Sequence, residues 1–257
     1  MEGAAGYNMK SVSILMSNFN SHEAVQLAVE SVRHYTLYPG YRLIVYDDRS
    51  TNDVDVPYLR EAKRRGLITK LIEGNRRSNH GAALNVLMGL CETDLAMVLD
   101  CDVEITGEGW LRDMVGCVDD STLAVLGIED NRTTRGRPTL PSWFQSWFML
   151  WNMAAYRDGM EADWRTASVQ YGGASVFCPT GGRIWLNQQQ ANPKRYAFVP
   201  LPKSVRRKFR HVAHISVLGD LRESDPEKLH AVRRKKLSVA CERLELLRAD
   251  VKGRGHD

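Results

Sequence analysis

Two carboxylates close an apolar run in the stretch LAMVLDCDVEI, residues 95–105. Asp100 and Asp102 are separated only by Cys101. The run predicts a buried strand, and negative charge at the end of such a strand is costly unless a cation balances it. Hard cations such as Mg²⁺ and Mn²⁺ bind one or two protein carboxylates together with phosphate oxygens of a substrate. The spacing therefore predicts a divalent metal site that serves a phosphate-containing ligand.

Polar side chains also follow two earlier apolar runs. Asn18 and Asn20 come after the run at 11–17, and Asp47 and Asp48 end the run at 41–48. A solvated turn or a helix N-cap explains any one of these groups by itself. Their repetition at several strand ends favours one shared site.

The elements that must position these residues alternate along the first half of the chain. Short β-branched runs stand at 11–17, 41–48, 67–74, 95–102 and 122–130, and helical patterns stand between them at 21–35, 56–66, 80–92 and 107–120. Strict alternation predicts an α/β fold with a mostly parallel sheet and helices on both faces. Ligands of such sheets bind outside the carboxyl ends of the strands, which is where the acids stand.

The alternation ends after Asp130. A loop is expected at 131–142, and the aromatic stretch at 143–156 predicts a helix because Trp143, Trp147 and Trp151 recur every fourth residue. These tryptophans either pack into the core or form an acceptor platform or interfacial patch.

The late part of the chain is basic. No carboxylate occurs between Arg165 and Gly219, a segment that holds nine Lys and Arg residues. An anion is expected nearby, although a basic run is more often a solvated face. The stretch at 224–251 predicts a long C-terminal amphipathic helix that starts with a capping box at Ser224 and Glu227.

Composition sets wider limits. The chain has 257 residues, of which 43% are hydrophobic, and this suffices for a globular core. Its net charge of +4 is too small to indicate a class of binding partner. Five scattered cysteines without a CxxC pair favour a reduced, cytoplasmic setting. No window is long and apolar enough for a transmembrane segment or a signal peptide, so we expect a soluble protein.

Four motifs over residues 11–130 resemble, in the right order, those of the family-two glycosyltransferases with the GT-A fold. VSILMSNFN is similar to the family's opening strand, LIVYDDRSTND to its "DDGSTD" region, NHGAALN to its Asn-x-Gly motif, and DCD to its D-x-D motif. Ser17 stands where the family usually has proline. The resemblance implies a GT-A (Rossmann-like) sheet and a metal-dependent sugar transfer.

The resemblance also implies site residues. The donor nucleotide is expected to contact Ser17, Asn18, Asn20, Asp47, Asp48, Asn79 and Asp100, with Asp48 the first candidate for base and ribose. Asp100 would touch ribose or metal, and Asp102 would bind a Mn²⁺ or Mg²⁺ ion that bridges the diphosphate. A late histidine often completes the metal site, and of His211 and His214 the sequence setting favours His214.

The family's usual acidic pair is missing after YGGA, so the catalytic base has several candidates. They are Glu129 and Asp130 after the fifth run, and Glu161 and Asp163 in GMEADWR. An inverting enzyme needs such a carboxylate close to the acceptor hydroxyl, whereas a retaining enzyme does not.

The expected function is transfer of a sugar, with a UDP-sugar as first candidate donor, to a hydroxyl. The acceptor is either a saccharide or lipid-linked glycan, as in bacterial members, or a hydroxymethylated DNA base, as in some viral relatives, which would place the protein in the host cytoplasm. A nucleotidyltransferase and a non-catalytic nucleic-acid-binding module are the alternatives. The expected organisation is a nucleotide-sugar half at 1–130, an acceptor half at 131–220 and a C-terminal helix at 221–257, within one compact domain.

Overall fold

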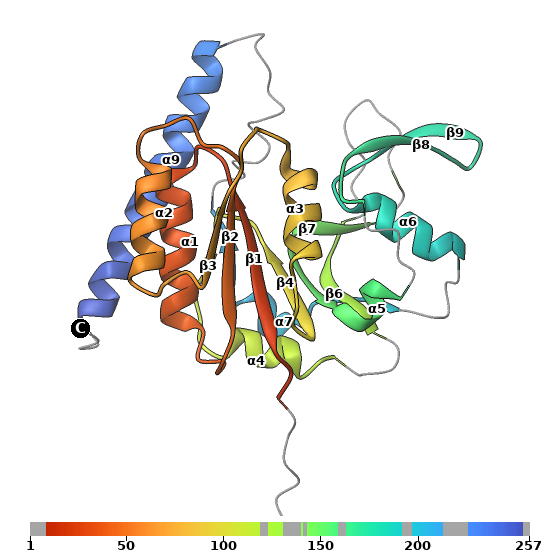
Figure 1. Ribbon diagram of the computed structural model, residues 1–257, viewed down its shortest axis with the longest axis horizontal. Helices are drawn as coiled ribbons and strands as arrows, with labels where there is room; N and C mark the ends of the chain where they lie inside the picture. Colours follow the sequence, from red (N-terminus) through yellow and green to blue (C-terminus); the bar gives the residue numbers. More distant parts are fainter. Residues whose placement is uncertain are drawn as a thin grey trace, which may run out of the picture.

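A computed structural model describes residues 9–118, 123–130, 140, 143–158, 163–191, 197–212 and 226–253. A seven-stranded sheet runs through the middle of the molecule in the order β10-β6-β7-β4-β1-β2-β3 (Figure 1). Its strands are β1 (Val12–Asn18), β2 (Arg42–Asp47), β3 (Lys70–Glu73), β4 (Leu95–Leu99), β6 (Leu123–Asp130), β7 (Trp143–Asn152) and β10 (Ala197–Pro200). Only β7 is antiparallel to its neighbours, β4 and β6. The mostly parallel α/β sheet that the sequence predicted is confirmed.

Helices cover both faces of the sheet because the strands are apolar on both sides. One core cluster joins residues of β1, β2 and β4 to α1 (His22–Tyr35), α2 (Asp55–Arg64) and α4 (Trp110–Val115). A second cluster joins the opposite face to α3 (His80–Gly89), α5 (Met153–Arg157) and α6 (Gly182–Ala191). All seven residues of β1 are buried, as expected for a central parallel strand.

Two small sheets complete the architecture. β5 (Val103–Ile105) pairs with β11 (Phe209–His211), and β8 (Ala167–Tyr171) forms a hairpin with β9 (Ala174–Cys178). The short helix α7 (Lys203–Arg206) lies between β10 and β11, and the long helix α9 (Pro226–Gly253) runs beside α1. No helix in the described part of the chain combines the length and apolar character needed to cross a bilayer.

The prediction of a helix at 143–156 is wrong. The stretch forms strand β7, and only Met153–Arg157 are helical. A spacing of four residues fits a helical turn of 3.6, but it is also an even number, as a strand requires. The pairing of β7 with β4 and β6 decides the matter and places residues from beyond position 130 inside the main sheet.

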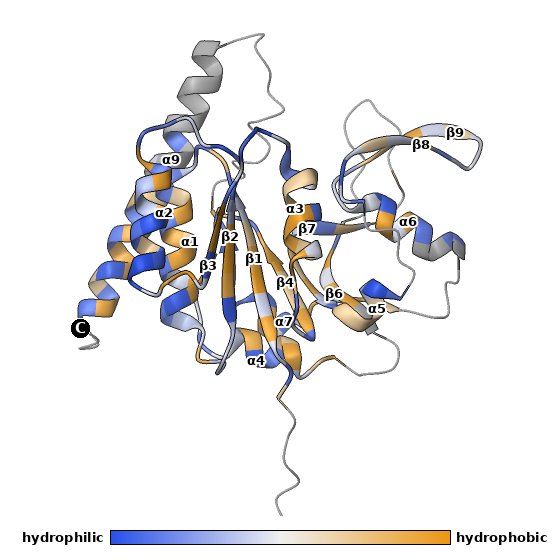
Figure 2. Cartoon of the chain, in the orientation of Figure 1, coloured by the Kyte–Doolittle hydropathy of each residue, from blue (hydrophilic) through white to orange (hydrophobic). Residues whose placement is uncertain are grey.

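The loops after β2 and β3 are strongly hydrophilic, in contrast to the strands beneath them (Figure 2). They lie at the edge where β1 and β2 end, at the top of the view. This edge carries the predicted site.

Candidate active site

The predicted acids of the DCD motif meet a histidine from far along the chain. Asp100, Cys101 and Asp102 form the turn between β4 and β5, in which Val103 N–H donates to the Asp100 carbonyl at 3.2 Å. His211 enters through β11, whose backbone pairs it with Val103. Its Nε2 lies 3.0 Å from Asp102 Oδ1, and ligand atoms of Asp100, Asp102 and His211 all lie within 4.8 Å of one another.

Neighbouring strands hold this cluster in place. Asp100 N–H donates to the Trp147 carbonyl of β7 at 3.0 Å, and Val212 N–H donates to the Asp102 carbonyl at 2.9 Å. The Trp147 ring stacks on the His211 imidazole with a centroid distance of 4.4 Å. The cluster is thus fixed before any ligand binds.

The cluster fits a divalent cation. Asp100 and Asp102 are almost fully buried, at 5% and 3% exposure, and Asp100 Oδ1 has no hydrogen-bond partner. Burial raises the pKa of the Asp100 carboxyl, and the Asp102 charge raises it further, against opposing effects of His80 and His211. Two close, buried acids with an unsatisfied oxygen need positive charge, and carboxylates with an imidazole are a usual donor set for divalent metals.

A second histidine flanks Asp100. His80, the first residue of α3, has Nδ1 at 3.0 Å from Ser17 Oγ and Nε2 at 3.3 Å from Asp100 Oδ1. Ser17 is the next-to-last residue of β1. The first strand, the start of α3 and the DCD turn therefore meet at one point.

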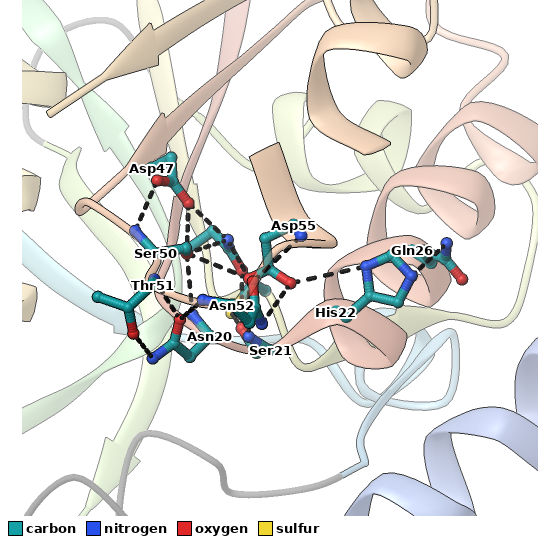
Figure 3. Close-up of polar contacts among 11 residues, drawn as sticks. Asn20, Ser21, His22, Gln26, Asp47, Ser50, Thr51, Asn52 and Asp55 are labelled. Carbon is teal, nitrogen blue, oxygen red and sulfur yellow. Dashed lines mark hydrogen bonds and ion pairs between the residues drawn. The ribbon is translucent and has the colours of Figure 1, made fainter. Parts of the chain in front are cut away.

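Buried amide and carboxylate groups connect the ends of β1 and β2 (Figure 3). Asn18 Nδ2 donates to Asp47 Oδ1 at 2.8 Å and to Asp55 Oδ2 at 2.9 Å. Ser21 N–H also donates to Asp55 Oδ2, and Ser50 N–H and Oγ–H donate to Asp47. Asp47 is therefore a structural anchor of the loop that follows β2.

The remaining predicted donor-site residues shape the same loops. Asn20 exchanges hydrogen bonds with Thr51, and its backbone adopts φ +50°. Asp48 Oδ1 accepts from Ser78 N–H and Oγ–H at 2.8 and 2.7 Å. Asn79 caps α3 by accepting from Ala82 N–H. The structure thus brings the predicted residues to one edge, and their contacts with a nucleotide stay a prediction.

Asp163 is held by cations. Its carboxylate accepts from Arg165 Nε at 2.9 Å, from Arg183 at 2.6 Å and from Asn85 at 3.2 Å. The Arg165 guanidinium holds the pKa of this carboxyl well below its usual range. A carboxylate of such low basicity is a weak proton acceptor, which does not favour the predicted role as catalytic base.

The side chains of three other predicted site residues lie outside the described part of the chain. His214 and Glu161 lie outside the described residues. Asp130 ends β6, where its backbone pairs with Trp143, but its side chain is outside the described part.

Sequence reasoning missed Asp55 and His80. Asp55 follows the DDRSTND region and begins α2, a setting that resembles an ordinary helix start. His80 stands inside the NHGAALN motif, between Asn79 and Gly81. Only its position inside that motif could have signalled a role for His80.

Comparison with known families identifies the chain. Residues 13–179, well over half of the sequence, match the family model described as glycosyl transferase family 2. This chain belongs to glycosyl transferase family 2. The resemblance in the four motifs is confirmed, and the mostly parallel sheet agrees with the GT-A fold that the resemblance implied.

Solved structures similar to this family 2 chain share its fold at low identity. The mannosyltransferase PcManGT from Pyrobaculum calidifontis, in complex with GDP-Man and Mn²⁺, is 14% identical with a TM-score of 0.55 over 95% of this chain and 76% of that one. Glucosyl-3-phosphoglycerate synthase from Mycobacterium tuberculosis, with Mn²⁺, UDP-Glc and phosphoglyceric acid, is 15% identical with a TM-score of 0.51 over 92% of this chain and 80% of that one.

S. aureus TarS is also similar to this family 2 chain, at 17% identity and a TM-score of 0.47 over 61% of this chain. The match covers 30% of TarS, and 47% in its 1–349 form with UDP-GlcNAc. No curated protein matches significantly.

Proposed function

We propose that this glycosyltransferase moves a sugar from a nucleotide diphosphate sugar to an acceptor hydroxyl, with a divalent metal held by Asp100, Asp102 and His211. The observation that carries the proposal is the buried cluster of these three residues, in which Asp100 Oδ1 lacks a partner. The similar folds of PcManGT and glucosyl-3-phosphoglycerate synthase support it, because both were crystallised with Mn²⁺ and a nucleotide sugar or its parts.

Mn²⁺ fits better than Mg²⁺ in this proposal. Mg²⁺ prefers a set made of oxygen ligands alone, and both similar structures hold Mn²⁺. When bound, the ion supplies positive charge that stabilises the leaving diphosphate.

The protein's own residues hold the metal ligands and the nucleotide-binding side chains in place. The pairing of β5 with β11 fixes Asp102 against His211, so the ligands need little rearrangement on binding. Asp48 lies at the end of β2 and is held there by Ser78. We propose that its Oδ2, which has no hydrogen-bond partner among the described residues, contacts the nucleoside.

A saccharide or glycan hydroxyl is the acceptor that we propose, in preference to a DNA base. The exposed cations Lys203, Arg206 and Arg207 belong to or follow α7, which packs against α4 at the end of the sheet away from the ends of β1 and β2. Arg165 and Arg183 pair with Asp163, and Lys208 pairs with Asp113. Three of these basic side chains are thus balanced by acids, which weakens the case for a surface that binds a DNA backbone.

The test removes one metal ligand. Asp102→Asn should bind Mn²⁺ much more weakly in electron paramagnetic resonance titrations, and its transfer activity should fall roughly 100- to 1,000-fold because the leaving group loses its charge partner. Excess EDTA should lower the transfer activity of the wild type in the same way, because it removes the metal. Asp94→Asn, at the other end of β4, is the matched control and should keep metal binding. Full activity of the wild type in EDTA would refute the metal assignment.

The donor and the acceptor are tested with the same protein. UDP-sugars and GDP-sugars are offered with saccharide acceptors and with hydroxymethylcytosine DNA, and products are weighed by mass spectrometry. Transfer to the DNA alone would overturn the saccharide proposal.

A further inference from the structure

One of the three tryptophans of β7 lies at the candidate active site. Trp143 and Trp151 are buried and pack in the core. Trp147 is half-buried, and its ring lies against the His211 imidazole, with a centroid distance of 4.4 Å and an angle of 24° between the two planes. Trp147 is thus placed to act on a metal ligand.

An irregularity in β7 aims this ring at the cluster. β7 has four residues, 145–148, where β6 has one, Ile128, because the register of the pairing shifts there. Bulges of this kind bend a strand and redirect its side chains, and they are frequent beside active sites. Within the bulge, the Trp147 indole N–H donates to Gln145 Oε1 at 3.1 Å. The extra residues of β7 therefore hold the ring in one orientation.

The strand that carries His211 needs support beyond its backbone pairing. β5 and β11 pair over three residues each, and a two-stranded ribbon of that length is marginally stable by itself. Phe209 and His211 are two positions apart, so their side chains share one face of β11. On that face the Phe209 ring stacks on Phe148 at 3.8 Å, and the His211 ring stacks on Trp147. Aromatic side chains of β7 thus hold β11 in place.

Trp147 contacts two of the three residues of the metal cluster. Its carbonyl accepts from Asp100 N–H at 3.0 Å, and its ring covers one face of the His211 imidazole. The ring restricts rotation of the imidazole, whose Nε2 lies 3.0 Å from Asp102 Oδ1. An imidazole that is free to rotate loses conformational entropy when it binds a metal, and this loss weakens binding. An imidazole that is already held in place avoids that loss.

We propose that Trp147 is a positioning residue of the metal site, whose ring keeps His211 in the orientation that binds the ion and so raises the affinity for divalent metal. The proposal rests on the proposed function, because it takes His211 as a metal ligand. The role requires no contact between Trp147 and a substrate. It implies that the ring at position 147 affects metal affinity through His211.

Replacement of the ring tests the proposal in the whole chain. Trp147→Leu keeps an apolar side chain that cannot stack, and we expect it to bind Mn²⁺ about 10-fold more weakly in electron paramagnetic resonance titrations, the usual effect of losing support for a metal ligand. Trp147→Phe restores a flat ring and should bind Mn²⁺ within about threefold of the wild type. Recovery with phenylalanine distinguishes stacking from simple filling of space.

Trp143→Leu is the matched control for loss of a tryptophan from β7. Trp143 packs with Val176 and Leu186 in a separate cluster. Its replacement should lower the melting temperature, while the affinity for Mn²⁺ stays at the wild-type value. Equal weakening of Mn²⁺ binding by Trp143→Leu and Trp147→Leu would assign the effect to a general loss of packing and overturn the inference.

A double-mutant cycle shows whether Trp147 acts through His211. His211→Ala should weaken Mn²⁺ binding more than Trp147→Leu does, because it removes the ligand itself. In the His211→Ala background, Trp147→Leu should change the Mn²⁺ affinity by less than about twofold, since the effects of residues that act as one unit are not additive. An undiminished effect in that background would contradict the proposed role.

Tryptophan fluorescence keeps the test decisive if Trp147→Leu folds poorly. Mn²⁺ quenches the emission of an indole that lies close to it, so addition of Mn²⁺ should quench part of the wild-type emission. Trp147→Phe should bind Mn²⁺ but lose most of this quenching, whereas Trp143→Phe should retain it. Undiminished quenching in Trp147→Phe would place the ring away from the ion and overturn the inference.

The Mn²⁺ titrations separate this inference from the proposed function. If the wild type binds no Mn²⁺, the metal assignment in the proposed function fails, and the role of Trp147 fails with it. If the wild type and Trp147→Leu bind Mn²⁺ equally well, the inference is overturned while the proposed function stands.

Discussion

Asp163 shows how surroundings decide what a carboxylate can do. Its sequence context suggested a catalytic base, yet two guanidinium groups and the Asn85 amide occupy its oxygens. Arg165 lowers its pKa strongly, so it stays ionised over the ordinary pH range. We infer that Asp163 fastens the segment before β8 to α3 and α6, because Asn85 and Arg183 belong to those helices.

Asp163→Asn should therefore reduce the free energy of unfolding at pH 7 by roughly 1 kcal/mol, as charged hydrogen bonds become neutral ones. The folded-state pKa lies below the unfolded value of about 3.9, so this stabilisation is present above that value and is lost as the pH falls through the folded pKa. The gap between the unfolding free energies of wild type and variant in urea denaturation should begin to narrow as the pH falls below about 4, and it should close only as the pH falls through the folded pKa. A gap that stays constant from pH 7 down to about pH 2 would contradict the ion-pair account.

At the scale of elements, Asp55 joins the loop after β1 to the loop after β2. It is fully buried and accepts hydrogen bonds from the Asn18 and Asn52 side chains and from Ser21 N–H. It also begins α2, where the helix dipole favours a negative charge. This one side chain holds together the two loops that carry the predicted nucleotide contacts.

Asp55→Asn should cost roughly 2 to 4 kcal/mol of stability, because one carboxylate oxygen is replaced by an NH₂ group that faces other donors. Asp53→Asn, two residues earlier, is the matched control, since Asp53 is exposed and should tolerate the change. Thermal unfolding of both variants gives the measurement. Equal melting temperatures for the two would show that the buried network contributes little.

At the scale of the whole molecule, α9 connects the C-terminal region to the site. Leu244 and Leu247 pack on Leu27 of α1, and Arg243 donates to both oxygens of Glu104 at 2.7 to 3.2 Å. Glu104 is 3% exposed and lies in β5, two residues after Asp102. The buried ion pair therefore ties the last helix to the strand that carries the metal turn.

Arg243→Met should reduce stability by roughly 3 to 5 kcal/mol, because it leaves Glu104 charged and buried without a partner. Arg248→Met breaks the more exposed pair with Glu30 and should cost less than about 1 kcal/mol. Adding Glu104→Gln to Arg243→Met should recover part of the loss in chemical denaturation. Similar losses for the two arginine variants would mean that burial of Glu104 does not set the cost.

Local patterns in the sequence were enough to predict the fold class and the edge of the sheet that carries the site. Alternating strand and helix patterns fixed the α/β class, and acids at the ends of apolar runs fixed the site's edge, because parallel strands deliver their carboxyl ends to one side. The four ordered motifs fixed the family. The basic segment gave a weaker signal, since several of its charges are balanced by acids distant in sequence.

Features that depend on partners far away in the chain could not be predicted, because those partners meet only in the folded protein. The stretch around Trp147 fits a helix and a strand equally well by spacing, and pairing with β4 and β6 made it a strand. His211 joins Asp102 across 109 positions through the pairing of β11 with β5, a contact that no local pattern contains. Asp163 likewise met its arginines only in the fold. The type of a residue and its neighbours in sequence indicate which chemistry it can take part in. Its interaction partners set its charge and its reactivity, and they come from chain segments that only folding brings together.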